Sequence, residues 1–107
     1  MATALKSEIL HLAEMVIYQD GSVVSRQIIK AEAGNVTLFA FDKDQELSEH
    51  TAPFDALAHI LDGHAEIKIS GKAFHVQAGE AIIMPANEPH ALKATTPFKM
   101  LLTMIRN

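Results

Sequence analysis

Hydrophobic and polar residues alternate over short stretches along most of the chain, and glycine, proline or asparagine separates one stretch from the next. Between Val36 and Phe41, for example, Val, Leu and Ala alternate with Thr and two Phe residues. A period of two is typical of a β-strand that has side chains on both faces of a sheet. Strands are predicted in residues 22–32, 36–43, 55–63, 64–71, 72–79, 80–89, 90–95 and 98–107.

The succession of short strands predicts an all-β fold, because an antiparallel sandwich or barrel hides the sheet edges of such a chain. The N-terminal part is less regular: residues 5–16 fit either a short helical turn or an edge strand, and Asp20-Gly21 suits the tight turn of a hairpin. We expect residues 1–23 to lie outside the barrel as part of the mature fold, and residues 1–107 to form a single domain.

The composition is that of an ordinary globular protein, since 49% of the 107 residues are hydrophobic and 21% are charged. The absence of cysteine excludes disulfides and thiol nucleophiles, which leaves His, Asp and Glu as candidate metal ligands. A net charge of -4 with scattered Lys and Arg argues against a nucleic-acid partner. No hydrophobic run is long enough to span a membrane, and the N-terminus lacks the features of a secretory signal. We therefore expect a cytoplasmic protein with no nucleic-acid or membrane partner.

One stretch near the C-terminus combines glycine, proline and histidine at a recognisable spacing. Gly79 can turn the chain into a strand and Pro85 can end that strand. Asn87 can then adopt the left-handed conformation that usually requires glycine, and His90 starts the next strand. The stretch GEAIIMPANEPHA resembles the second motif of the cupins, whose last position, often Asn, is here Ala94.

The positions of the first cupin motif are also present at the right spacing, and Asp44, His50, Ala52, Ala56 and Gly63 occupy them. The resemblance covers residues 24–105 and is to a small, RmlC-like single-domain cupin with a degenerate first motif. It implies a double-stranded β-helix, also called a jelly-roll or cupin barrel. In cupins, three histidines and one glutamate from the two motifs bind a divalent metal, whereas this chain keeps two of the histidines and has alanine at the other two positions.

Two further residues are candidate ligands near the missing glutamate position. Asp55 and His59 would face the cavity if a bulge changed the alternation of their strand; otherwise Asp55 is a solvated turn residue and His59 a sheet-face or interface histidine. The resemblance implies that His50 and His90 each start a strand and are neighbours at one end of the cavity. With Asp55 or His59 they would leave an open coordination position on Zn, Ni, Mn or Fe.

Three kinds of function remain open. The first is a binding protein whose cavity takes a small molecule, with His50 and His90 as polar anchors among apolar residues such as Phe41, Met84 and Met100. The second is a metal-dependent enzyme of the oxygenase or isomerase type, and the third is a module that works through dimerisation. Because both faces of several predicted strands are apolar, we also expect a two-fold homodimer.

Overall fold

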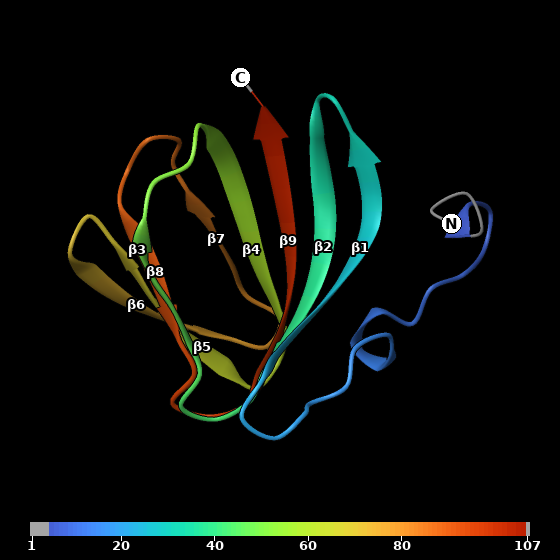
Figure 1. Cartoon of the computed structure of the whole chain (residues 1–107), viewed down its shortest axis with the longest axis horizontal. Helices are drawn as coiled ribbons and strands as arrows, with labels where there is room; N and C mark the ends of the chain where they lie inside the picture. The colour runs from blue at the N-terminus through green and yellow to red at the C-terminus, as the bar shows by residue number, and fades with distance from the viewer. Residues whose placement is uncertain (1–4, 107) are drawn as a thin grey trace.

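The computed structural model describes residues 5–106, which form two antiparallel sheets (Figure 1). The strands are β1 (Val23–Ala31), β2 (Gly34–Phe41), β3 (Glu46–His50), β4 (Phe54–Asp62), β5 (His64–Ile69), β6 (Lys72–Gln77), β7 (Ala81–Met84), β8 (His90–Lys93) and β9 (Phe98–Arg106). A 3-10 helix, η2 (Leu12–Glu14), precedes the strands. No helix in this part of the chain is long and apolar enough to cross a membrane.

The sheets have the strand orders β1-β2-β9-β4-β7 and β3-β8-β5-β6. Consecutive strands repeatedly cross from one sheet to the other, which makes the fold a double-stranded β-helix, as the sequence predicts. In Figure 1 the sheets converge at the bottom and diverge toward the top, where the β1–β2, β3–β4, β5–β6 and β7–β8 connections lie. The barrel therefore has a closed end and an open end, which we call the mouth.

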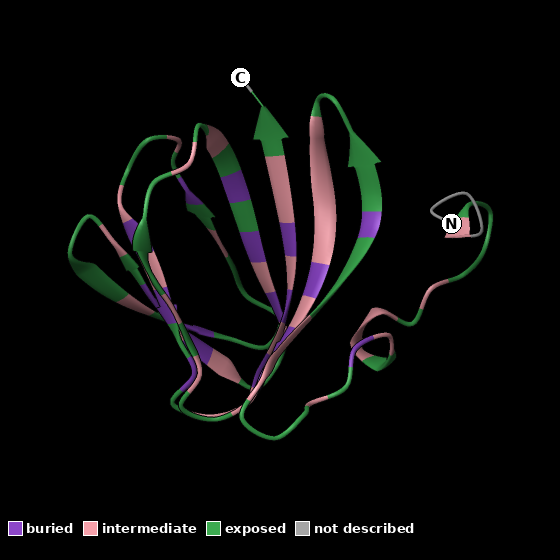
Figure 2. Cartoon of the chain, in the orientation of Figure 1, coloured by how far each residue is buried: buried purple, intermediate pink, exposed green. Residues whose placement is uncertain are grey.

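Strict alternation along β4 shows how the sequence selects its inner face. Ala56, Ala58 and Ile60 are buried, whereas the residues between them are more exposed, as the bands on β4 in Figure 2 show. Removing these apolar side chains from water is the main force that holds the two sheets together. The same alternation determines which side chains of β4 can reach the cavity.

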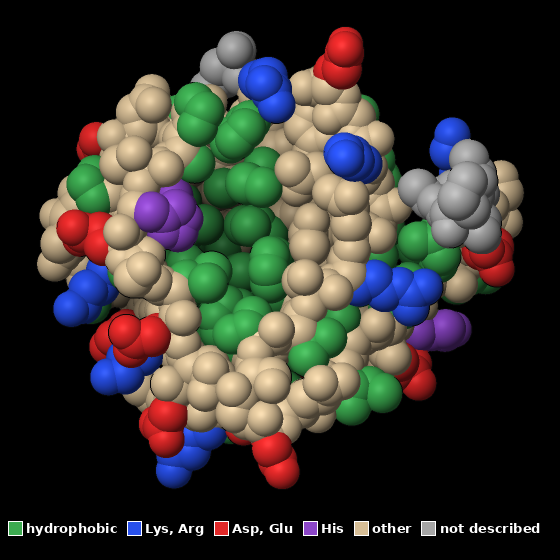
Figure 3. Space-filling view, in the orientation of Figure 1, with side chains coloured by type: hydrophobic (Ala, Val, Ile, Leu, Met, Phe, Trp, Pro, Cys, Tyr) green, Lys and Arg blue, Asp and Glu red, His purple; other side chains and the backbone are tan. Residues whose placement is uncertain are grey.

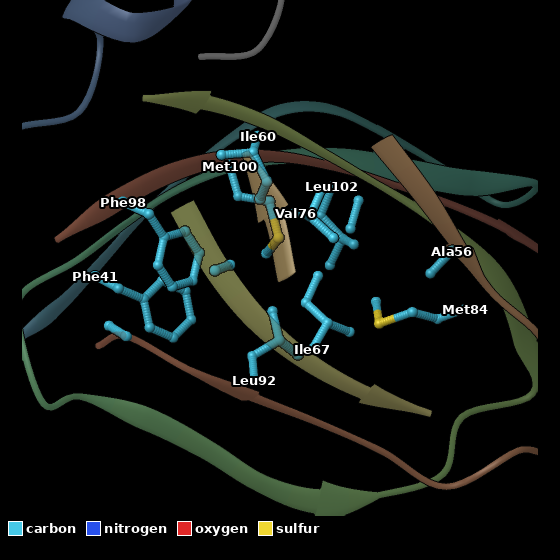
Figure 4. Close-up of a cluster of buried hydrophobic side chains, with 13 residues drawn as sticks. Phe41, Ala56, Ile60, Ile67, Val76, Met84, Leu92, Phe98, Met100 and Leu102 are labelled. Atoms are coloured by element: carbon cyan, nitrogen blue, oxygen red, sulfur yellow. The ribbon is translucent and has the colours of Figure 1, made fainter. Parts of the chain in front are cut away.

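The closed end is filled by aromatic side chains. The rings of Phe41 and Phe98 are stacked with centroids 4.5 Å apart, and both residues are fully buried. Met100 packs beside them, and Figure 4 shows these side chains crowded at one end of the core, with Ala56 and Met84 toward the other. The closed end is therefore tightly packed, and we call the layer formed by Phe41, Phe98 and Met100 the floor of the barrel.

The N-terminal segment, residues 5–22, packs on the outer face of the five-stranded sheet. Val16 is buried there in a second cluster with Leu38 and Ala40 of β2. The tyrosine hydroxyl of Tyr18 donates a 2.5 Å hydrogen bond to Asp62 and so ties the segment to the end of β4. The helical alternative for residues 5–16 is realised only as the single turn η2.

The predicted hairpin at Asp20-Gly21 is wrong. Gly21 does adopt a left-handed conformation (φ 63°), but no strand precedes it among residues 5–22. Its backbone N–H donates to the carboxylate of Asp42 at 2.7 Å instead. The segment before Gly21 packs its apolar side chains on the face of a sheet, whereas a hairpin strand would pair its backbone with the edge of a sheet. Turn residues alone do not distinguish these two arrangements.

Candidate functional site

Two histidines meet at the mouth of the barrel. His50 is the last residue of β3 and His90 the first residue of β8, and they stand opposite one another in the four-stranded sheet. Their Nε2 atoms are 3.1 Å apart, and the ring centroids are separated by 4.4 Å. The prediction that the rings are neighbours is confirmed. The prediction that His50 starts a strand is wrong, because the polar residues before it form the edge strand β3, where solvent-exposed polar side chains are common.

Hydrogen bonds to the backbone define which nitrogens of the two rings carry hydrogen. Nδ1 of His50 lies 2.8 Å from the carbonyl oxygen of Ser48, and Nδ1 of His90 lies 3.2 Å from that of Glu88. A carbonyl oxygen only accepts hydrogen bonds, so each Nδ1 is the donor. In the neutral rings both Nε2 atoms would then present lone pairs to each other at 3.1 Å. The contact is attractive only when one Nε2 also carries a proton, or when a ligand or cation lies between them.

The two rings have different surroundings. His90 is only 6% exposed and His50 is solvent-exposed. Burial lowers the pKa of His90, the hydrogen bond to the carbonyl of Glu88 opposes this shift, and the neighbouring His50 lowers the pKa further. The Nε2 atom of His90 is therefore the natural hydrogen-bond acceptor of the pair.

The loop before His90 is held from both sides. Asn87 has a left-handed backbone (φ 65°), as predicted, and its N–H donates to the carbonyl of Ala52 at 2.8 Å. On the same side, Asp55 accepts a 2.9 Å hydrogen bond from the N–H of Ala86. On the other side, the N–H of Ser70 donates to the carbonyl of the residue before His90 at 2.8 Å. These bonds determine the direction in which the ring of His90 points.

A hollow between the two sheets opens beside the pair. Figure 3 shows it lined by hydrophobic side chains, with a histidine and several Lys or Arg side chains near its edge. Met84, Leu92 and Ile67 belong to the same core cluster as the aromatic floor, and Met104 packs against that cluster while remaining partly exposed. The hollow thus has an apolar interior and a polar entrance.

The model of the cupin domain family matches residues 37–105 of the chain. The chain belongs to the cupin superfamily. A conserved protein of unknown function from Streptococcus pyogenes is 37% identical, with a TM-score of 0.90 over 94% of this chain and 89% of the other. The cupin 2 conserved barrel domain protein from Leptotrichia buccalis is 41% identical, with a TM-score of 0.88 over 91% of this chain and 47% of the other.

A cupin superfamily protein from Desulfitobacterium hafniense, 24% identical with a TM-score of 0.89 over 95% of this chain and 94% of that one, has the same fold. No curated protein matches the sequence. These comparisons establish the family and the fold.

The remaining ligand positions of the cupin pattern do not complete a metal centre. Ala56, at the glutamate position, is buried on the inner face of β4 and offers no donor atom, and Ala52 likewise has only a methyl side chain. Among residues 5–106, no group of three or more His, Asp or Glu side chains could hold a metal ion. The residues present could supply two ligands to a metal, whereas protein metal sites generally supply three or four.

Asp55 and His59 are not brought to the histidine pair. They flank the inward-facing residues of β4, so alternation directs both to the outer face of the five-stranded sheet, and no bulge interrupts the pairing at either residue. Instead, Asp55 holds the loop that leads to His90. This positioning role could not be deduced from sequence spacing, since it depends on where Ala86 lies in space.

Asp44 has a backbone conformation that its position in the first cupin motif predicts. It stands at the glycine position of the first cupin motif and adopts a left-handed conformation (φ 70°), which Asp tolerates better than most residues. Its N–H donates to the carbonyl of Ala94 at 2.7 Å. The motif's backbone geometry has thus been kept although its glycine and two of its ligands have not.

Proposed function

We propose that this cupin binds a small organic molecule in the hollow between its sheets, with His50 and His90 as the polar contact. The observation that carries the proposal is the 3.1 Å approach of two Nε2 atoms at the entrance of an apolar hollow. An apolar site with a few convergent polar groups is the usual form of a small-molecule pocket. A ligand atom that bonds to either Nε2 would replace the strained arrangement of two facing nitrogens.

The apolar residues of the hollow would supply most of the contact area. Met84 and Met104 are well suited to this, because an unbranched thioether adapts to different ligand shapes. Phe41 and Met100 lie beneath them in the fully buried floor, so their role would be to limit the depth of the site.

The alternative is a metal-dependent enzyme, and one observation favours it. Metal-binding histidines usually donate the other ring N–H to a carbonyl or carboxylate, and both members of the pair donate Nδ1–H to a backbone carbonyl. A Zn, Ni, Mn or Fe ion on the two Nε2 atoms would still need its remaining ligands from water or substrate. The incomplete donor set is the reason for preferring an organic ligand.

Binding should be tested by NMR titration with small amphipathic molecules such as hexanol, hexanamide and hexanoate. We expect at least one of them to shift the methyl resonances of Met84 and Met104, and Ala56→Leu to weaken binding by filling the hollow. Leu57→Ala, on the outer face of the same strand, is the matched control and should bind as the wild type does. Absence of any shift at the methionines, or equal binding by Ala56→Leu, would exclude the proposed site.

Thermal melts with zinc, nickel, manganese and iron(II) distinguish the alternative. An ion at 100 times its dissociation constant stabilises a folded protein by about 2.7 kcal/mol, which is roughly ten degrees in Tm for a domain of this size. We expect no such rise. A rise in the wild type that disappears in both His50→Ala and His90→Ala would establish a metal site in place of the proposed one.

We also propose that the cupin forms a two-fold homodimer through the outer face of its five-stranded sheet. Leu57 and Ile83 stand opposite one another there, with Ile105 on the neighbouring strand, and the three are 42%, 60% and 57% exposed. Such a band is buried when a second copy covers it. Light scattering should give twice the 11.7 kDa chain mass, and Leu57→Glu should halve it. A wild-type monomer at micromolar concentration would contradict the proposal.

A further inference from the structure

The inner face of the barrel has a charge distribution that the proposed function does not use. Residues directly opposite on neighbouring antiparallel strands point to the same face of a sheet. Lys30 pairs with Asn35, and Asn35 pairs with Met104, which packs against the core. Lys30 is therefore on the inner face. Alternation along β9 places Arg106 on the same face, and the register of β5 with β6 places Lys72 on the inner face of the other sheet.

The charged side chains on this inner face are all positive. At the inward positions of the described strands, the charged side chains are Lys30, Lys72 and Arg106, and none is acidic. This is unexpected for a chain with 13 acidic residues and 9 Lys and Arg residues. On the outer face of the four-stranded sheet, by contrast, Glu66 lies directly opposite Lys93.

The cations gather at the mouth rather than at the floor. Lys72 belongs to the same cross-strand row as His50 and His90, at the end of the four-stranded sheet. On the facing sheet, Lys30 shares a row with Met104, and Arg106 lies one inward position beyond it. Figure 3 shows Lys and Arg side chains near the edge of the apolar hollow. Negative charge is thus favoured at the entrance and apolar groups are favoured below it.

Arg106 is placed to recognise a planar anion. Its guanidinium lies 5.1 Å from the ring centroid of Phe54, which restrains the side chain while leaving hydrogen-bond donors at its edge. Within residues 5–106, no carboxylate forms an ion pair with it. Because a guanidinium matches a carboxylate with two parallel hydrogen bonds, Arg106 favours this group over a neutral one.

We propose that the ligand of the hollow is a small carboxylate with an apolar tail. The carboxylate lies at the mouth, where it is attracted by Arg106 and Lys30 and accepts a hydrogen bond from Nε2 of the His50–His90 pair when that pair carries an additional proton. The tail extends toward Met84. This inference rests on the proposed function and specifies the chemical class of its ligand.

The test compares hexanoate with hexanamide, which has the same shape but no charge, by NMR titration of the full chain at low salt. We expect hexanoate to bind about tenfold more tightly than hexanamide, and Arg106→Gln to remove most of this difference by weakening the binding of hexanoate. The matched control is Lys68→Gln, which removes a cation from the outer face of the four-stranded sheet and should change neither dissociation constant by more than about twofold.

The possible failures are distinguishable. Equal binding of hexanoate and hexanamide, with shifts at Met84, would refute the carboxylate preference and leave the proposed function intact. An equal loss of hexanoate affinity in Arg106→Gln and Lys68→Gln would show a general charge effect and refute the role of the mouth. If neither hexanoate nor hexanamide nor hexanol bound, the proposed function would fail together with this inference. Tighter binding of hexyl phosphate than of hexanoate would assign the mouth to phosphate esters instead.

Discussion

The closed end and the mouth of the barrel are made from the same strands, yet their side chains are packed differently. Along β9, Phe98 at the closed end is fully buried and stacked on Phe41, whereas Met104 near the mouth is partly exposed. Along β4, Ile60 gives way to Ala56 in the same direction. From the closed end to the mouth, the inward side chains thus change from large, rigid groups to small or flexible ones. This leaves room at the mouth while the strands keep the same arrangement.

This comparison separates the end that stabilises the fold from the end at which we propose that a ligand binds. Buried aromatic groups contribute most to folding because they remove the largest apolar area from water. The mouth combines polar and cationic groups with incomplete packing, and such groups contribute little to folding but can discriminate between ligands. Substitutions at the two ends should therefore affect different measurements.

The largest expected effect is at the floor. Phe98→Ala should lower the free energy of unfolding by about 3–5 kcal/mol, since it removes a stacked, fully buried ring and leaves a cavity. Met104→Ala, an inward position on the same strand but at the mouth, should lower it by less than half as much. Urea unfolding at constant pH measures both. Similar losses at the two positions would show that the mouth is packed as tightly as the floor.

Two glycine turns at opposite ends give the next largest contrast. Gly63, at the closed end, and Gly71, at the mouth, both have positive φ, so alanine is strained by about 1–2 kcal/mol at either position. At Gly63 a Cβ would also lie 2.0 Å from the carbonyl oxygen of Pro97, whereas at Gly71 it would meet no atom within 4 Å. Gly63→Ala should therefore reduce stability clearly more than Gly71→Ala in the same urea experiment. Equal reductions would mean that the turn at Gly63 can move away from Pro97 without any further loss of stability.

The closed end and the mouth also differ in how far the sequence predicted them. The strands that form the floor have regular alternation and strong turn residues, and these local features identify them. At the mouth, Asn87 and His90 were predicted because loop chemistry and motif spacing are also local. The edge strand β3 was missed because a solvent-exposed edge has no hydrophobic pattern.

Orientation at the mouth depends on register, which spacing alone does not define. The sequence left open whether Asp55 and His59 face the cavity, since one bulge in β4 would have reversed both. The row that joins Lys30 to Met104 runs through β1 and β2, which form a hairpin, and then through β9, which lies far along the chain from both. The pairing of Asn35 with Met104, which places Lys30 on the inner face, is revealed only by the assembled sheet.

At the mouth itself, Asn87 tests how the loop before His90 is built. Asn87→Gly should be neutral or slightly stabilising because glycine adopts positive φ freely, whereas Asn87→Val should reduce stability by about 1–2 kcal/mol. We expect the valine variant to bind hexanoate more weakly as well, because the loop orients His90. Equal tolerance of glycine and valine in thermal melts would contradict a strained loop.

The smallest expected effect is a dependence of stability on pH that originates at the mouth. The pKa of His90 is lowered in the folded state, chiefly by burial, so between that value and the unfolded value of about 6.5 the unfolded chain binds more protons. Stability from this residue is complete above pH 6.5 and is lost as the pH falls toward the folded-state pKa. The urea midpoint should therefore decrease between pH 7.5 and 5.5, less steeply in His90→Ala than in the wild type. His75→Ala, which removes an exposed histidine of β6, is the control and should keep the wild-type dependence. An unchanged slope in His90→Ala would mean that His90 is protonated in the folded state without penalty, and its burial at the mouth would then give it no preferred charge state with which to select a ligand.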